Sequence, residues 1–337
     1  MLGKTVLAFV LVVASAAAYN ALEIFYYRSA YPAPGRLYTI DGYAMHLYCT
    51  GVGSPTVIME GGIGADWLTW QRVQPELAKV TRVCSYDRAG MGWSDWRPGA
   101  HDALATATRL NQLLQAAGMT GPFVLMGQSA GGLYVREYQA KYPQTVIGLV
   151  FVDATPPESF ARIPGNRISA ADWRKLQRQL FWQKLEVVTG ISRVLGNCRG
   201  KTPHGLEAYE GWVKAKACRP SLLGGVLLEL GDFEKSGEEV GQTESFGTLP
   251  VLIISQDPER SKPGWSAQEI AANPIWNSLQ ENLKGLTTHS CRIIAKTSGH
   301  HIELDRPDVI VAAVKKMILE LRGKSEVPVK CDATATL

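Results

Sequence analysis

The sequence lacks the features that mark nucleic-acid and metal-binding proteins. Its 337 residues carry a net charge of only +4, and lysine and arginine are scattered instead of forming a basic run or a stripe interleaved with aromatic residues. This distribution argues against nucleic-acid binding. No CxxC pair and no histidine at zinc-ligand spacing is present, so no metal site is predicted. Internal repeats are also missing, which leaves a globular chain with one large core.

The cysteines fit an oxidising compartment. Paired thiols persist outside the cytoplasm, whereas simple buried thiols are the alternative interpretation. The sequence does not determine the connectivity. The six residues are Cys49, Cys84, Cys198, Cys218, Cys291 and Cys331.

The first 28 residues have the pattern of an export segment. Lys4 precedes an uncharged apolar run from Thr5 to Tyr19, and the small residues of "VVASAAAYNA" offer Ala-x-Ala cleavage sites at residues 14–16 and 16–18. A signal peptide is one interpretation, and an uncleaved membrane anchor over residues 5–27 is another. A third is a buried helix of the fold. Both export interpretations predict a periplasmic or extracellular protein, free or anchored to the membrane by this segment.

From residue 29 onward, short apolar segments alternate with helical patterns. Uniformly apolar strands separated by helices predict an α/β fold with a mostly parallel sheet covered on both faces. A hairpin with the turn Asp41-Gly42 precedes them. The expected strands are 37–40, 44–49, 56–60, 82–86, 123–127, 146–153, 251–255 and 291–295, and the clearest helices are 103–117, 130–141 and 307–323.

One long segment interrupts this alternation. Residues 155–246 lie between two expected core strands and contain Trp173, Trp182 and Trp212. They are interpreted as a helical cap inserted over the carboxyl edge of the sheet, where open α/β sheets bind ligands. The predicted organisation is an export segment (1–28), core (29–154), cap (155–246), core (247–323) and a polar tail (324–337).

The stretch "FVLMGQSAGGLYVREY", residues 123–138, carries the clearest chemical signal. A GxSxG pattern alone is weak, but here it follows a buried strand and opens a helix, as the nucleophile-elbow motif requires. Gly127 and Gly131 would relieve crowding, and Ser129 would present its hydroxyl from a strained turn. A structural serine in a plain turn is the alternative. Ser129 is therefore the predicted nucleophile.

A serine nucleophile needs a base, and His300 is the best candidate. It follows the last expected strand, in "SGHHIELDRP", so it returns to the sheet edge that holds Ser129. His301 is the close competitor. The remaining histidines, His46, His101, His204 and His289, are expected to be surface or loop residues.

Taken together, these motifs resemble the α/β-hydrolase superfamily from about residue 37 to residue 323. The resemblance rests on "EGGIGA", "RVCSYDRAGMGWSD", "GQSAGG" and "SGHHIELDRP". It implies an eight-stranded sheet, an esterase- or lipase-like serine hydrolase, and His300 as the base. The chain order of serine, acid and histidine agrees with it.

The acid that should orient His300 has three candidates. Asp257, in "SQDPER" after the strand 251–255, is preferred, and Glu259 in the same turn is an alternative. Asp153, which ends "LVFVD", stands where some relatives of the superfamily place the acid. Its other interpretation is a cap for the following turn.

An oxyanion hole is expected from two backbone N–H groups. One belongs to Ala130, directly after the nucleophile, and by resemblance the other belongs to Gly62. Glu60-Gly61 stands where the superfamily usually has His-Gly, which puts a carboxylate near the site, and a nearby arginine is its suggested partner. In "YDRAGMGWSD", Asp87 and Arg88 are expected to tie the turn. Trp93 is a candidate pocket residue, but a structural role for this stretch is the favoured interpretation.

The resulting hypothesis is cleavage of a carboxylic ester through an acyl-enzyme, without metal or organic cofactor. A serine at the elbow argues against epoxide hydrolase or haloalkane dehalogenase activity, because those relatives use aspartate there. An exported aminopeptidase or amidase is the first alternative, and a non-catalytic binding module is the second. An acidic site for a substrate amine would favour the amidase, with candidates Glu60, Glu207, Glu210, Glu238 and Glu239.

Overall fold

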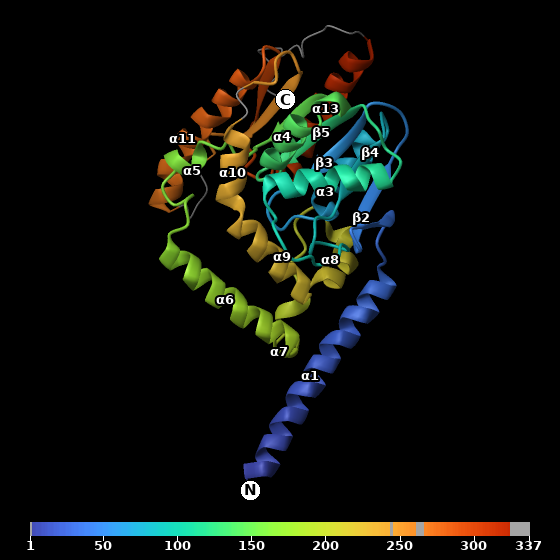
Figure 1. Ribbon diagram of the computed structural model, residues 1–337, viewed down its shortest axis with the longest axis vertical. Coiled ribbons are helices and arrows are strands. Elements are labelled where there is room, and N and C mark those ends of the chain that lie inside the picture. Colours follow the sequence, from blue (N-terminus) through green and yellow to red (C-terminus); the bar gives the residue numbers. More distant parts are fainter. Residues whose placement is uncertain (1, 243–244, 261–265, 324–337) are drawn as a thin grey trace.

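A single sheet forms the centre of the protein (Figure 1). The computed structural model describes residues 2–242, 245–260 and 266–323, so the tail 324–337 lies outside the described residues. The strands are β1 (Arg36–Ile40), β2 (Tyr43–Thr50), β3 (Thr56–Glu60), β4 (Val83–Tyr86), β5 (Phe123–Gln128), β6 (Val146–Val152), β7 (Val251–Gln256) and β8 (Ser290–Ala295).

The strand order is β1-β2-β4-β3-β5-β6-β7-β8. β1 and β2 form the expected hairpin, β2 pairs antiparallel with β4, and all the other pairs are parallel. In the register, Glu60 lies opposite Gly127 and Gln128 lies opposite Val152. The carboxyl ends of β3, β5 and β6 therefore meet at one edge. The α/β class and the mostly parallel eight-stranded sheet are confirmed.

Alternating side chains of the strands supply two cores, one on each face of the sheet. Ile58, Leu125 and Phe151 point into one core, and Val57, Val124 and others point into the opposite one. This pattern explains why the strands are apolar throughout, since both faces are covered. The first core is closed by α3 (Ala103–Ala116) and α4 (Gly131–Lys141), and the second by α2 (Gln74–Leu77) and α13 (Pro307–Gly323).

Helices alone, with short helical turns, occupy the described chain between β6 and β7. This agrees with the expected helical cap. The limits of the cap at residues 155 and 246, like the other domain limits, are a proposal. β7 is then followed by α11 (Ala267–Asn282), and β8 by α12 (Ile302–Asp305). The cap helices are α5 (Ser159–Arg162), α6 (Ala170–Val188), α7 (Ile191–Val194), α8 (Glu210–Lys216), α9 (Pro220–Gly231) and α10 (Phe233–Gly241).

The N-terminal helix α1 (Leu2–Ala30) extends away from the sheet (Figure 1). Its segment Gly3–Ala30 is long and apolar enough to cross a membrane, with a mean hydropathy of 2.0 over its 18-residue window. Only 6% of that window is buried. A signal sequence and a membrane anchor both have these properties.

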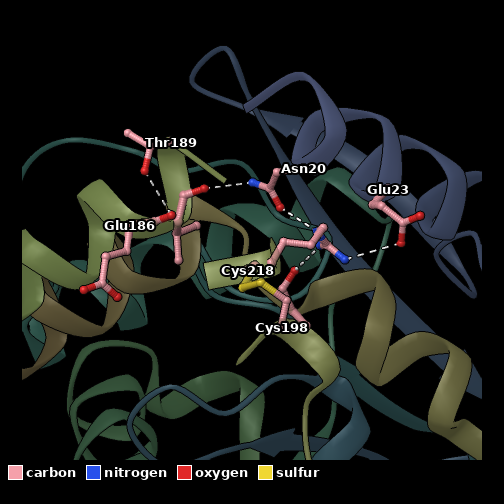
Figure 2. The surroundings of a disulfide bond; sticks show 9 residues. Asn20, Glu23, Glu186, Thr189, Cys198 and Cys218 are labelled. Carbon is pink, nitrogen blue, oxygen red and sulfur yellow. Dashed lines mark hydrogen bonds and ion pairs between the residues drawn. A yellow bond between two sulfur atoms is a disulfide. The ribbon is translucent and has the colours of Figure 1, made fainter. Parts of the chain in front are cut away.

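Two disulfide bonds lie within the described residues. Cys49–Cys84 joins β2 to β4, and Cys198–Cys218 closes part of the cap beside α1 (Figure 2). The prediction of oxidised pairs is confirmed for these four cysteines. Cys331 lies outside the described residues.

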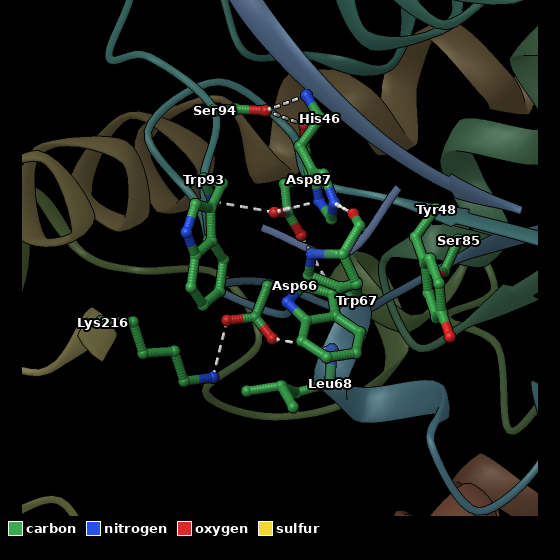
Figure 3. A network of polar contacts seen from close by, with 12 residues as sticks. His46, Tyr48, Asp66, Trp67, Leu68, Ser85, Asp87, Trp93, Ser94 and Lys216 are labelled. Atoms are coloured by element: carbon green, nitrogen blue, oxygen red, sulfur yellow. Dashed lines mark hydrogen bonds and ion pairs between the residues drawn. The ribbon is translucent and has the colours of Figure 1, made fainter. Parts of the chain in front are cut away.

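Three residues lie in the interior of the protein. His46 and His101 were expected at the surface or in loops; His46 instead lies in β2, whereas His101 does lie in a loop, and both are buried. His46 is held by Asp87 and by the carbonyl of Pro34, which gives its two ring nitrogens partners in the interior. Trp93 packs edge-on against Trp67 in a buried aromatic cluster rather than lining a cavity at Ser129 (Figure 3).

Candidate active site

Ser129 occupies a strained turn between β5 and α4. Its φ of +54° lies in the left-handed region, which a side chain other than glycine rarely adopts. A β-carbon on Gly127 would collide with the Gly131 carbonyl, and one on Gly131 would collide with the Glu60 carbonyl. The turn is held further by the Ser129 carbonyl, which accepts the Gly132 N–H at 3.0 Å and the Thr155 N–H at 2.9 Å. This local geometry is that of a nucleophile elbow.

The imidazole of His300 is paired with Asp153. His300 lies in the loop between β8 and α12, and its Nδ1 is 2.6 Å from Asp153 Oδ2. The other oxygen of Asp153 accepts the indole N–H of Trp276 at 3.0 Å and the backbone N–H of Gln256 at 3.1 Å. Asp153 is fully buried and has a φ of +42°. A carboxylate held by three donors fixes the orientation of the ring.

The structure contradicts the expectation that Asp257 faces His300. One oxygen of Asp257 accepts the Thr297 N–H at 2.9 Å, and the other accepts the Glu259 N–H at 3.1 Å. Lys296 approaches the same carboxylate at 3.4 Å. Burial opposes the charge of Asp257, but the Thr297 and Glu259 N–H bonds, followed by the charge of Lys296, outweigh it and hold the pKa of Asp257 below its usual value. Asp257 therefore ties the turn after β8 to β7.

Glu259 does not meet His300 either. Its side chain is exposed and pairs with Lys296 at 2.9 Å. The physical reason for both misplacements is the path of the β8 loop, which crosses the end of β7 and brings His300 to the end of β6. Asp153, directly after β6, is then the nearest carboxylate.

Two cavities meet at Ser129 and His300. One has a volume of about 380 Å³ and is lined by Phe233 and Trp276, among others. The second, of about 440 Å³, is lined by Leu206 and residues of the Gly62 loop. No hydrogen bond joins Ser129 to His300 in the described residues. Such bonds are often long without substrate and shorten when it binds.

The loop after β3 lies directly against Ser129. A β-carbon on Gly62 would stand 2.7 Å from Gln128 Oε1 and 3.0 Å from Ser129 Cβ, so a larger residue would have to displace these atoms. The Gly62 N–H donates to Gln128 Oε1 at 3.1 Å, and Gln128 Nε2 donates to the His300 carbonyl at 3.3 Å. Gln128 thus joins the Gly62 loop to the His300 loop. An oxyanion at Ser129 would have to share the Gly62 N–H with Gln128.

A buried arginine holds this loop from behind. Arg88 donates to the Gly61 carbonyl at 2.9 Å and to the Gly62 carbonyl at 2.6 Å. It also pairs with Glu60 and, at 2.7 Å, with Glu229 of cap helix α9. The suggested pairing of Glu60 with an arginine is therefore present, and Glu60 is sequestered from the cavities.

Glu229 was not identified from the sequence. It accepts the Gly64 N–H at 2.8 Å and the Arg88 Nε–H at 2.7 Å, so it joins α9 to the loop beside Ser129. The available signal was one carboxylate in the otherwise apolar run of α9, "PSLLGGVLLELG". A buried charge in such a helix requires a partner.

Burial raises the pKa of Glu60, with Arg88 and Tyr86 opposing that effect.

Comparison with known proteins agrees with this fold. Residues 55–196 match the model of the alpha/beta hydrolase fold family. An uncharacterised protein of Schizosaccharomyces pombe is 28% identical over 87% of this chain, and the chain spans 57% of that relative's length. Thus part of that relative has no counterpart here.

Solved structures show the same fold. A putative epoxide hydrolase from Pseudomonas aeruginosa aligns with a TM-score of 0.63 at 17% identity, covering 85% of this chain and 96% of that structure. An esterase from Thermogutta terrifontis aligns with a TM-score of 0.58 at 19% identity, covering 85% and 98%. The chain therefore has the alpha/beta hydrolase fold, and the part of it that matches the family model is residues 55–196.

Proposed function

We propose that the protein is a serine hydrolase that cleaves carboxylic esters, with Ser129, His300 and Asp153 as its triad. The observation that carries the proposal is the Asp153–His300 hydrogen bond at a cavity wall shared with the Ser129 elbow. Asp153 thus replaces Asp257 as the proposed acid.

The chemistry follows from the placement of each group. His300 Nε2 takes the proton of the Ser129 hydroxyl as Oγ attacks the ester carbonyl. The oxygen that becomes negative is stabilised by the N–H groups of Ala130 and Gly62. His300 then returns the proton to the leaving alkoxide. A water molecule, deprotonated by the same nitrogen, hydrolyses the acyl-enzyme and releases Ser129.

The two cavities suggest separate places for the acyl and alcohol parts of a substrate. Each cavity is large enough for a short chain or a ring, and both contain Ser129 and His300 in their walls. An ester whose carbonyl stands at Ser129 would extend into both. A small-molecule ester is therefore the proposed substrate class.

A fluorophosphonate probe tests the nucleophile directly. Wild-type protein should form a covalent adduct on the peptide that contains Ser129, and Ser129→Ala should form none. An unlabelled wild type, or equal labelling of the variant, contradicts the proposal. It would instead favour a non-catalytic binding module on this scaffold.

The second candidate is an amidase or aminopeptidase of the same fold, favoured by Glu303. This residue is fully buried and lines the 440 Å³ cavity. Its Oε1 pairs with His301 at 3.0 Å, whereas its Oε2 has no hydrogen-bond partner in the described part of the chain. A buried carboxylate oxygen without a donor could bind a substrate ammonium group.

The two candidates separate in a paired assay. If the protein is an esterase, p-nitrophenyl acyl esters should turn over well and aminoacyl anilides poorly, and Glu303→Gln should change the ratio little. If the anilides turn over better and Glu303→Gln raises their KM selectively, the amidase is correct.

A further inference from the structure

The far end of α6, together with α7, presents large apolar side chains to the outside. We name this surface the α6–α7 tip. Within residues 181–195, only three positions are buried. Monomeric soluble proteins rarely gather apolar side chains in one exposed place. The tip consists of Phe181, Trp182, Leu185, Val188, Ile191, Val194 and Leu195, which are between 41% and 68% exposed.

The tip lies beside the apolar part of α1 (Figure 1). A cavity between the two is lined by Val194 of α7 and by Leu11 to Tyr19 of α1. Gly190 permits this approach, because a β-carbon there would collide with the Ala16 carbonyl. The exposed apolar surface of the tip therefore continues onto that of α1.

Hydrogen bonds and an ion pair join α1 to the cap at residues 20–23. Asn20 donates to the Val187 carbonyl at 2.9 Å, and Arg193 donates to Asn20 Oδ1 at 2.7 Å. Arg193 also pairs with Glu23 at 3.5 Å (Figure 2). Glu23 is the one acidic residue in Gly3–Ala30, and its partner comes from the cap. The cap and α1 therefore behave as one body at this level.

If α1 spans a membrane, its length determines how deep the α6–α7 tip lies in the bilayer. A bilayer core of about 30 Å needs about 20 helical residues. A span that begins at Lys4 ends near Glu23, which places the Asn20–Glu23 bonds at the membrane boundary. Ala16 lies seven residues before Glu23, or about 10 Å farther into the core at 1.5 Å per residue. Because Gly190 touches Ala16, the tip lies at that depth as well.

We propose that the α6–α7 tip inserts into the lipid leaflet on the catalytic side, next to a retained α1. Interfacial helices bury their apolar faces about 5–10 Å into a membrane, which agrees with the depth of Gly190. Trp182 and Phe181 are residue types that favour this zone. Farther up α6, the exposed Arg174, Lys175 and Arg178 would face anionic headgroups.

This arrangement requires an uncleaved N-terminus. Cleavage after residue 18 would remove Ala16 and the wall that Leu11 and Val12 give to the α1–α7 cavity. The inference does not depend on the proposed reaction, since a bilayer would hold the tip whether or not Ser129 attacks an ester.

Photolabelling of the full chain in phosphatidylcholine vesicles tests the proposal. The vesicles contain a phospholipid with a diazirine in its acyl chain, and adducts are mapped by mass spectrometry. We expect adducts in α1 and, separately, in residues 181–195. In Trp182→Asp/Leu195→Asp, adducts in residues 181–195 should fall at least fivefold, while those in α1 persist.

A matched variant controls for added charge. Val52→Asp/Leu319→Asp also replaces two exposed apolar residues, at 85% and 60% exposure, but both lie away from the tip. It should leave the labelling unchanged. Trp182→Ser/Leu195→Ser provides a milder version should the charged tip variant fail to fold, and circular dichroism checks each protein.

Three results overturn the proposal. The first is labelling of residues 181–195 no higher than that around Leu319. The second is a membrane-derived protein whose N-terminus begins after residue 18. The third is protein–protein adducts at the tip in place of lipid adducts, which would assign the surface to a second copy of the chain.

Discussion

Two histidine–aspartate pairs in this protein look alike and serve different purposes. His46 Nδ1 lies 2.7 Å from Asp87, and His300 Nδ1 lies 2.6 Å from Asp153. Both carboxylates are fully buried and accept further N–H groups; Asp87 accepts those of Trp67 and Trp93, each at 2.8 Å.

The difference lies at the second ring nitrogen. Nε2 of His46 is taken up by the Pro34 carbonyl, and the His46 side chain is fully buried (Figure 3). The His300 side chain is 36% exposed and lines both cavities beside Ser129. A histidine and a carboxylate thus form a structural bond when both nitrogens are occupied, and a candidate base when one faces a nucleophile. The predictions below test this distinction.

The largest expected effect separates the two aspartates near β7. Asp153→Asn should lower kcat by about 10²–10⁴-fold, because the amide cannot hold the reactive tautomer of His300. Asp257→Asn should leave kcat close to wild type, since its carboxylate serves Thr297 and Lys296. Steady-state esterase kinetics measure both. Equal losses would mean that Asp257 also acts on His300.

The second prediction distinguishes a histidine that stabilises the fold from one that acts in catalysis. His46→Phe leaves Asp87 buried without its charged partner, which should cost about 3–5 kcal/mol of unfolding free energy. Activity per folded molecule should persist. His300→Phe should do the opposite, abolishing activity with little loss of stability. Urea unfolding and active-site titration measure the two quantities, and a loss of kcat in folded His46→Phe would break the comparison.

The third effect is a pH dependence of stability. Burial opposes the charge of His46, but Asp87 and the Pro34 carbonyl outweigh it and raise the pKa of His46. For Asp87, His46 outweighs burial and lowers the pKa. A raised histidine pKa gives stability that is full below about pH 6.5 and is lost as pH rises through the folded value.

The lowered pKa of Asp87 affects the stability at low pH. Its contribution is full above about pH 3.9 and is lost as pH falls through the folded value. The pair should therefore stabilise most between these limits. Unfolding free energies of wild type and His46→Phe, compared from pH 4 to pH 9, should converge toward the alkaline end. A constant difference across that range would show that His46 is not held as a cation.

The smallest expected effect concerns Gln128. Removing an oxyanion donor itself costs about 10²–10³ in turnover, whereas Gln128 only joins the Gly62 and His300 loops. Gln128→Ala should thus lower kcat by about tenfold or less. Gln139→Ala, a buried glutamine of α4 outside the site, is the control. A loss greater than that for a missing donor would mean that Gln128 contacts the reacting group.

Local patterns in the sequence were sufficient to predict most of the fold. The strand 56–60 has the expected bounds, the helix after Asp102 begins at Ala103, and the Asp102 side chain accepts the Ala105 N–H as a cap. Such features depend on residues a few positions apart. The Ser129 turn was also predictable, because Gly127 and Gly131 are its immediate neighbours.

Pairings between distant segments were predicted less well. Glu229 is 141 residues from Arg88, and no local sequence pattern near either residue indicates this pairing. His46 was assigned to the surface or a loop because its partners, Asp87 and Pro34, lie on different segments. The height of α1 against the cap depends on Asn20 meeting Arg193, 173 residues away.

The sequence by itself therefore determined an α/β sheet, a serine at a strained corner and a histidine returning to the same edge. Only the tertiary structure decided which carboxylate meets that histidine, because Asp153 and Asp257 both end core strands and have similar local sequence signals. The β8 loop crosses the end of β7 to reach β6, and on the way its Thr297 N–H and Lys296 bind the Asp257 carboxylate, which also accepts the Glu259 N–H of its own turn. A choice between equivalent side chains is made by the path of the chain in space, which no local pattern encodes.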